Sequence, residues 1–154
     1  MIFSINTTSS DQTVRAAREL AKTLKPGQTV ELVGDLGTGK TTIAKAVINA
    51  LGFSGEVPSP TFTLSRSYRI SDDLVVDHFD LYRLHGHDVV TDELSESMED
   101  KQTITVVEWA DHGSARLPKD RVRVELTYGS GEADRIITIA ADPAAISKLK
   151  QGLR

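Results

Sequence analysis

Residues 34–41 read Gly-Asp-Leu-Gly-Thr-Gly-Lys-Thr, a complete phosphate-binding loop (P-loop): Gly, four free positions, Gly, Lys, then Ser or Thr. Glycines let such a backbone curl its N–H groups around phosphate oxygens. We expect the Lys40 ammonium to reach the β- and γ-phosphates and the Thr41 hydroxyl to bind Mg²⁺. The motif predicts binding of a nucleoside triphosphate through Gly34, Gly37, Thr38, Gly39, Lys40, Thr41 and Thr42.

The segments on either side of this loop support that interpretation. Residues 28–33 form a short β-type run, and residues 42–51 have helical spacing, with Gly52 as a stop. A strand, the loop and then a helix is the context that the motif requires. A glycine-rich turn that merely precedes Lys-Thr is therefore disfavoured. We also expect Lys40 to be an exposed loop residue that contributes little to stability.

Length and composition indicate one soluble domain covering residues 1–154. The chain is 39% hydrophobic and 26% charged, and it contains no Cys for a disulfide or a thiolate metal site. No apolar run approaches the ~20 residues of a membrane span, and no signal-peptide pattern is present. We expect a cytoplasmic protein without membrane contact. The net charge of −4 argues against a nucleic-acid-binding surface that covers the molecule.

Hydrophobic periodicity predicts the remaining elements. These are a strand over 1–6, a helix capped by Ser10 or Asp11 and ended by Pro26, a hairpin over 61–70 and 74–80, a weak helix over 88–98, a buried strand over 103–108, a hairpin over 121–128 and 135–140, and a helix opened by Pro143. Together they predict a three-layer α/β fold with parallel central strands around the P-loop and antiparallel strands at the edges.

Two carboxylates lie at the ends of predicted strands, where a P-loop enzyme needs an acidic partner for Mg²⁺. Glu108 ends the more buried strand and Asp80 ends the more alternating one. Either could instead be a helix cap or a solvated turn residue. Trp109, the only Trp, fits either the core or the edge of the nucleotide site. The loop over 59–61 lies where segments that sense the γ-phosphate tend to occur.

Histidines are predicted to matter less. His78 is interpreted as a packed or half-exposed strand residue rather than a catalyst, and His85 and His87 as part of a solvated turn.

Four segments together resemble the TsaE (YjeE) family of bacterial ATPases. They are residues 34–42, Ser-Pro-Thr-Phe at 59–62, His-Phe-Asp-Leu-Tyr-Arg-Leu at 78–84, and Val-Glu-Trp at 107–109. The run at 78–84 is far more distinctive than the P-loop. The resemblance spans nearly the whole chain and implies Mg-ATP hydrolysis in the synthesis of N6-threonylcarbamoyladenosine (t6A) in tRNA. It also implies that the TsaD and TsaB proteins are partners and that contact with tRNA is indirect.

The resemblance also implies roles for single residues. Thr41 and Glu108 correspond to Mg²⁺ ligands, and Asp80 corresponds to a residue needed for hydrolysis, which makes Lys40, Asp80 and Glu108 the catalytic candidates. Thr13, Arg135 and Trp109 complete the expected contacts to ATP or ADP.

Three other functions share the same loop. A small-molecule kinase usually adds a lid and an acceptor pocket, for which 154 residues leave little room. A GTP-dependent switch protein reads guanine with Asn-Lys-x-Asp, but Asn6 and Asn49, the only Asn residues, are followed by Thr and Ala. A nucleotide-binding regulatory scaffold without turnover stays open.

Overall fold

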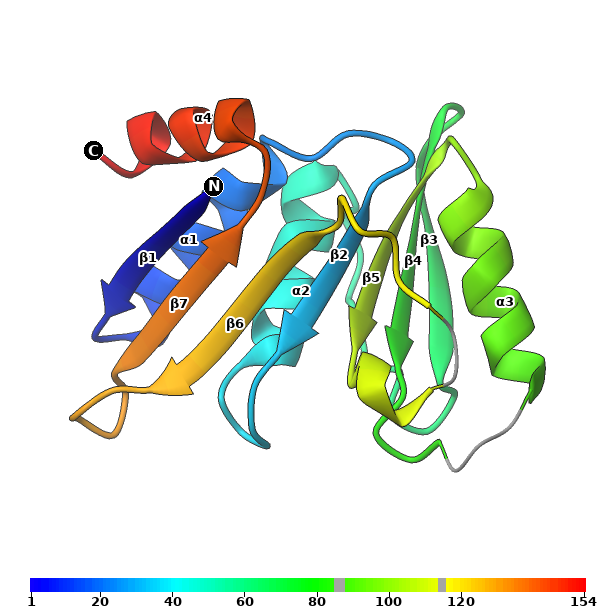
Figure 1. Ribbon diagram of the computed structural model, residues 1–154, viewed down its shortest axis with the longest axis horizontal. Helices are drawn as coiled ribbons and strands as arrows, with labels where there is room; N and C mark the ends of the chain where they lie inside the picture. Colours follow the sequence, from blue (N-terminus) through cyan, green and yellow to red (C-terminus); the bar gives the residue numbers. More distant parts are fainter. Residues whose placement is uncertain (85–87, 114–115) are drawn as a thin grey trace.

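The strand that carries the P-loop lies at the centre of a mixed sheet in the computed structural model, which describes residues 1–84, 88–113 and 116–154 (Figure 1). His85 and His87 lie outside the described residues. Within those residues seven strands form one sheet in the order β1-β7-β6-β2-β5-β4-β3. The strands are β1 (Ile2–Thr7), β2 (Thr29–Val33), β3 (Ser65–Ser71), β4 (Leu74–Asp80), β5 (Thr103–Glu108), β6 (Val122–Tyr128) and β7 (Arg135–Ala140).

The pairing confirms the predicted mixture of parallel and antiparallel strands. β2 runs parallel to β5 and β6, and β5 runs parallel to β4. The outer pairs β3–β4, β6–β7 and β1–β7 are antiparallel. Because β2, β4 and β5 are parallel, their carboxyl ends meet at one edge of the sheet, where Asp80 pairs directly with Glu108.

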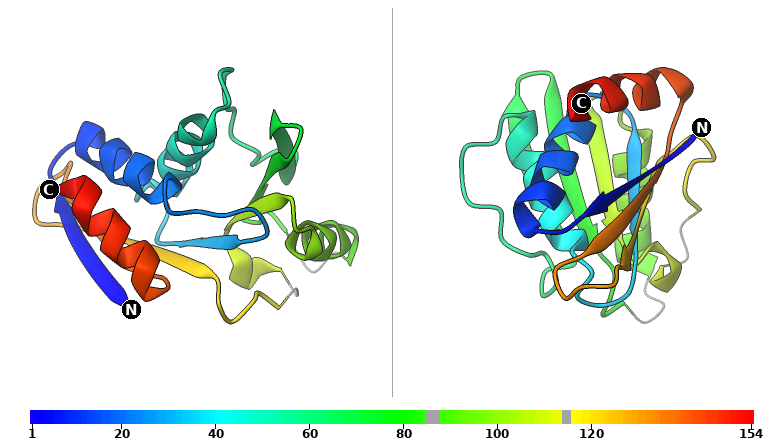
Figure 2. Two further views of the ribbon diagram at one scale, coloured as in Figure 1. Left: turned by 90° about the horizontal axis from the view of Figure 1, so that it is seen from above. Right: turned by 90° about the vertical axis from the view of Figure 1, so that its left-hand side faces the viewer.

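Helices cover both faces of the sheet, as the three-layer prediction requires (Figure 2). They are α1 (Ser10–Ala21), α2 (Lys40–Leu51), α3 (Asp88–Glu99) and α4 (Pro143–Leu153). α1 and α2 lie on one face, α3 lies on the other against β5, and α4 packs on α1. None of the helices in the described part of the chain is long and apolar enough to cross a membrane.

Two hydrophobic clusters follow from this layering. The larger lies under α1, α2 and α4 and includes Val30, Ile43 and Ile146. The smaller lies under α3 and includes Leu94 and Val107. All six residues of β5 are buried, as predicted for a strand that is covered on both faces. Because successive side chains of a strand point to opposite faces of the sheet, every second residue of β4 and of β5 faces the P-loop helix α2.

Three predicted boundaries were wrong, the first being the end of α1, which lies at Ala21 and not at Pro26. The cap of α1 is Ser9, not Ser10 or Asp11: its hydroxyl accepts from the Gln12 N–H, while the Gln12 side chain accepts from the N–H of Thr8. The first hairpin strand begins at Ser65 rather than at residue 61. The reason is Leu64, whose φ of 63° cannot continue a strand.

Candidate functional site

The P-loop connects β2 to α2 and packs against the neighbouring strand β6. Gly39 caps α2 with φ 110°, a conformation that L side chains rarely adopt. Gly34 has φ 154°, and a Cβ at this position would lie 2.6 Å from the backbone oxygen of Leu126 on β6. Glycine at position 34 is therefore needed for the close approach of the loop to the sheet.

The β6–β7 hairpin holds the outer side of the loop. The Tyr128 hydroxyl donates to the carbonyl of Leu36 at 2.7 Å, and Arg135 Nε donates to the carbonyl of Thr38 at 2.8 Å. The Arg135 guanidinium also lies over the Tyr128 ring. Through these bonds the C-terminal hairpin fixes the position of the P-loop backbone.

Lys40 is buried, so the expectation of an exposed loop lysine was wrong. Its exposed fraction is 5%, and Nζ donates to the carbonyls of Gly34 at 2.6 Å and Asp35 at 2.9 Å. Nζ also lies 4.2 Å from the centroid of the Trp109 ring. Desolvation lowers the pKa of Lys40 from its ordinary value, against the opposing field of the carboxylates of Glu108, Asp80 and Asp35.

Thr41 and Glu108 meet at the start of α2, as expected for two ligands of one ion. The Thr41 hydroxyl donates to Glu108 Oε1 at 2.9 Å and lies 3.3 Å from Oε2. Glu108 ends β5 with an exposed fraction of 1%. A third group, His78 Nε2, lies 2.6 Å from Glu108 Oε2. Glu108 is therefore a buried carboxylate beside the P-loop and not a solvated turn residue.

Asp80 lies beside Glu108 because β4 and β5 are paired in register. Its Oδ2 accepts from the Thr61 hydroxyl at 2.8 Å, and its Oδ1 accepts from the N–H of Tyr82 at 3.1 Å. The loop over 59–61 thus reaches the site through Thr61. The carboxylates of Asp80 and Glu108, the P-loop and Thr61 together line a cavity of about 360 Å³.

Trp109 lines the edge of this cavity and, half-buried, also packs against the smaller hydrophobic cluster. Its φ of 58° places it in the left-handed region, which is an outlier for a bulky residue. The indole packs against Tyr82 and His112, with ring centroids 5.0 and 5.2 Å away. His112 is tied to this aromatic cluster through Nδ1, which lies 2.8 Å from the carbonyl oxygen of Tyr82.

Thr13 and Arg135 lie together on the opposite side of the P-loop. With Gly37, Thr38, Gly39 and Thr42, they line a separate cavity of about 240 Å³. The Thr13 hydroxyl bonds to the hydroxyl of Thr7 at 2.8 Å. The Thr13 hydroxyl and the Arg135 guanidinium are thus already hydrogen-bonded within the protein, and both side chains form part of the cavity wall.

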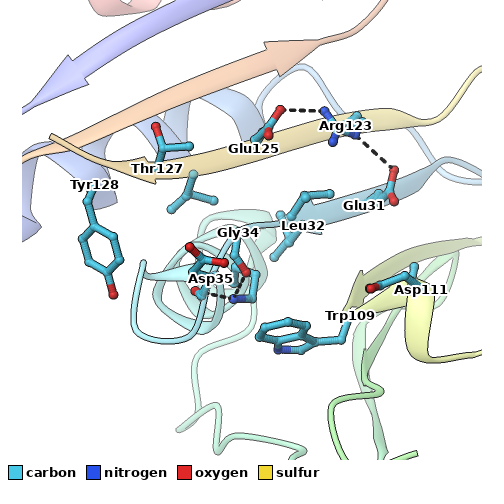
Figure 3. A pocket seen from close by; sticks show the side chains of 14 residues that line it. Glu31, Leu32, Gly34, Asp35, Trp109, Asp111, Arg123, Glu125, Thr127 and Tyr128 are labelled. Atoms are coloured by element: carbon cyan, nitrogen blue, oxygen red, sulfur yellow. Dashed lines mark hydrogen bonds and ion pairs between the residues drawn. The ribbon is translucent and has the colours of Figure 1, made fainter.

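A larger cavity of about 510 Å³ opens on the sheet face opposite α2 (Figure 3). Trp109 and Asp35 lie at one end of it, and the ion-paired side chains of Glu31, Arg123 and Glu125 lie along β2 and β6.

His78 is buried on β4, as expected for a packed strand residue, but sequence reasoning missed its contact with Glu108 and the contact of Tyr128 with the P-loop. The signal for His78 was present in the alternation of β4, because residues 78 and 80 must share a face. Tyr128 carried no local signal, since its contact with Leu36 joins segments that are distant in sequence.

This chain is similar to known proteins in sequence and in fold. A family model described as "Threonylcarbamoyl adenosine biosynthesis protein TsaE" matches residues 7–137. A Streptomyces coelicolor protein named tRNA threonylcarbamoyladenosine biosynthesis protein TsaE is 36% identical over 121 residues, covering 77% of this chain and 82% of the relative. A Bacillus subtilis protein of the same name is 34% identical over 137 residues, covering 88% and 83%. The crystal structure of Bacillus subtilis YdiB is similar with a TM-score of 0.75 and 28% identity, covering 99% of this chain and 94% of that one.

Proposed function

Because the chain belongs to the TsaE family, we propose that it binds and hydrolyses Mg-ATP in support of the t6A modification of tRNA. The observation that carries this proposal is the contact of 2.9 Å between the Thr41 hydroxyl and the Glu108 carboxylate beside Lys40. The P-loop hydroxyl and the strand-end carboxylate are the two protein ligands that such enzymes use for Mg²⁺.

The residues present fit a magnesium ion. Mg²⁺ in nucleotide sites takes one or two protein oxygens and completes its coordination with phosphates and water. Thr41 and Glu108 would hold it, and the bound ion would neutralise charge on the β- and γ-phosphate oxygens.

The remaining steps are assigned to residues of the chain. Lys40 exchanges its bonds to the carbonyls of Gly34 and Asp35 for the β- and γ-phosphates, which the first N–H groups of α2 also attract. Asp80 is the group that orients the attacking water, because its carboxylate lies next to Glu108 and faces the same cavity. Thr61 fixes that carboxylate by donating to Oδ2.

The cavity between Thr13 and Arg135 is proposed to receive the nucleoside of ATP or ADP. It adjoins the phosphate site through Gly37, Gly39 and Thr42, which line both cavities. We further propose that the TsaD and TsaB proteins are the partners of this chain in the cytoplasm and that they, rather than this acidic chain, hold the tRNA.

Partner dependence has a physical motive. Fast phosphoryl transfer needs positive charge on the γ-phosphate beyond a P-loop lysine and Mg²⁺, and a supplied arginine is worth roughly 10³–10⁵ in rate. Of Arg66, Arg69, Arg83 and Arg135, only Arg83 lines the phosphate cavity, and its guanidinium lies over the Phe62 ring. We therefore expect the isolated chain to be slow.

The experiment is a steady-state ATPase assay of the chain alone and with purified TsaD and TsaB proteins. We expect slow turnover alone and a large increase with both partners. Full activity alone, unaltered by either protein, would contradict the partner-dependent mechanism. Tight ATP binding with no turnover under any of these conditions would favour the regulatory scaffold instead.

A further inference from the structure

His78 is a fully buried histidine whose ring touches the metal-site carboxylate. It lies on β4 with an exposed fraction of 0%, and Nε2 is 2.6 Å from Glu108 Oε2. A carboxylate oxygen accepts hydrogen bonds, so Nε2 carries the proton and donates. The other ring nitrogen, Nδ1, is buried without a hydrogen-bond partner in the described part of the chain.

The backbone directs His78 to this contact. Residues 78 and 80 lie on the same face of β4, and that face is turned toward α2. His78 pairs in register with Val106, two residues before Glu108, so its ring lies one step deeper in the sheet than the carboxylate. The Glu108 carboxylate is thus hydrogen-bonded by His78 of β4 and by Thr41 of α2.

A packing role alone does not account for this arrangement. An apolar side chain would fill the same space without burying Nδ1 unpaired, which carries a desolvation cost. The bond from Nε2 to a buried carboxylate compensates that cost and restricts rotation of the carboxylate. Outer hydrogen bonds of this kind orient metal ligands, and their loss typically lowers metal affinity about 10–100-fold.

We propose that His78 is a positioning residue, whose Nε2–H fixes the Glu108 carboxylate in the orientation that binds Mg²⁺ together with Thr41. This inference rests on the proposed function, since it concerns the metal of the same site. It assigns to His78 no direct contact with nucleotide or water.

The test measures Mg²⁺ dependence through Trp109, the only tryptophan of the chain. Trp109 fluorescence is followed at saturating ADP while Mg²⁺ is titrated into wild type, His78→Leu and His78→Gln. We expect the Mg²⁺ midpoint to rise about 10–100-fold in His78→Leu, which lacks the donor. In His78→Gln the amide N–H can replace Nε2–H, so the midpoint should stay within a few-fold of wild type.

Val76→Ala is the matched control. Val76 is fully buried on the same face of β4, two residues earlier, and belongs to the main core cluster. Its truncation lowers stability without touching Glu108, so the Mg²⁺ midpoint should not move. If His78→Leu does not fold, His78→Asn replaces it, because the shorter amide cannot reach the carboxylate.

In this titration the inference would be overturned by a wild-type midpoint in folded His78→Leu or His78→Asn, or by equal shifts in the Gln and Leu variants. A ¹⁵N NMR spectrum of the histidines without Mg²⁺ supplies an independent readout. We expect a His78 Nε2–H signal that is displaced by Glu108→Gln, and an unprotonated Nε2 would also overturn the inference. If wild type binds no nucleotide with Mg²⁺ while that signal is present, the proposed function fails and the hydrogen bond stands.

Discussion

The Lys40 ammonium lies 4.2 Å from the centroid of the Trp109 ring, so the P-loop lysine is in contact with the residue that follows Glu108. A cation over an indole face is attracted by the ring quadrupole. The same ammonium bonds to two carbonyls of its own loop. Lys40 therefore links the loop to the carboxyl end of β5, and any movement of its ammonium changes the surroundings of Trp109.

We expect Trp109 fluorescence to change when Mg·ADP binds. Phosphate oxygens compete for the Lys40 ammonium, which alters the charge over the indole ring. The measurement is a fluorescence titration, with Lys40→Ala as the variant in which the response should disappear. A constant signal at saturating nucleotide would show that the indole does not sense the site.

Lys40→Ala should abolish productive ATP binding and turnover. The lysine supplies the point charge for the β- and γ-phosphates. Since Lys40 is buried and bonds to two carbonyls, we also expect a loss of about 1–2 kcal/mol of unfolding free energy. Isothermal calorimetry with ATP and thermal unfolding measure the two effects separately. Unchanged affinity and hydrolysis in the folded variant would remove Lys40 from the site.

Glu108→Gln should weaken nucleotide binding in the presence of Mg²⁺ more than in its absence. A neutral amide is a poorer ligand for a hard dication than a carboxylate. ADP affinity with Mg²⁺ and with EDTA gives the comparison. Glu125→Gln is the control, because Glu125 is a half-buried carboxylate on β6 paired with Arg123. Equal Mg²⁺ dependence in the Glu108 variant and wild type would contradict its role as a ligand.

Gly34→Ala should destabilise the fold by about 2–4 kcal/mol, through backbone strain and overlap with the Leu126 carbonyl. Gly131→Ala is the control, because a Cβ there meets the end of the flexible Asp134 side chain. Chemical denaturation of both variants gives the comparison. A loss in Gly34→Ala no larger than in the control would mean that the loop can move away from β6.

Adenine nucleotide should bind more tightly than guanine nucleotide. The chain has no Asn-Lys-x-Asp segment, through which GTP-dependent switch proteins read guanine. Competition between ADP and GDP for the same site measures the preference. GDP affinity equal to or above that of ADP would count against the assignment to an ATPase.

Local sequence signals predicted most of the fold. The P-loop, the buried run before Glu108 and the two hairpins each carry a short-range pattern, and the structure confirms the resulting parallel centre and antiparallel edges. The start of α1 was predicted wrongly because Ser9, Ser10 and Asp11 all suit a helix cap. Only the reciprocal bonds between Thr8, Ser9 and Gln12 select one of them.

The features that sequence patterns did not predict depend on contacts between segments that are distant in the chain. The buried ammonium of Lys40 is in contact with Trp109, a residue about seventy positions later in the chain. The role of Tyr128 depends on where the last hairpin lies relative to residue 36. Such contacts are products of the strand order, which hydrophobic periodicity leaves undetermined.

The left-handed backbone of Trp109 also has a consequence for attempts to make this protein more robust. A bulky residue at φ 58° costs about 1–3 kcal/mol, and Gly would relieve that strain. Gly at position 109 would, however, also delete the contacts of the indole with Tyr82, with His112 and with the smaller hydrophobic cluster, and loss of a packed aromatic side chain costs up to about 3–5 kcal/mol. The packing of the indole thus outweighs the strain of the backbone beneath it, so Trp109→Gly should lower the melting temperature as well as the nucleotide response, and thermostabilised variants of this chain should keep Trp109.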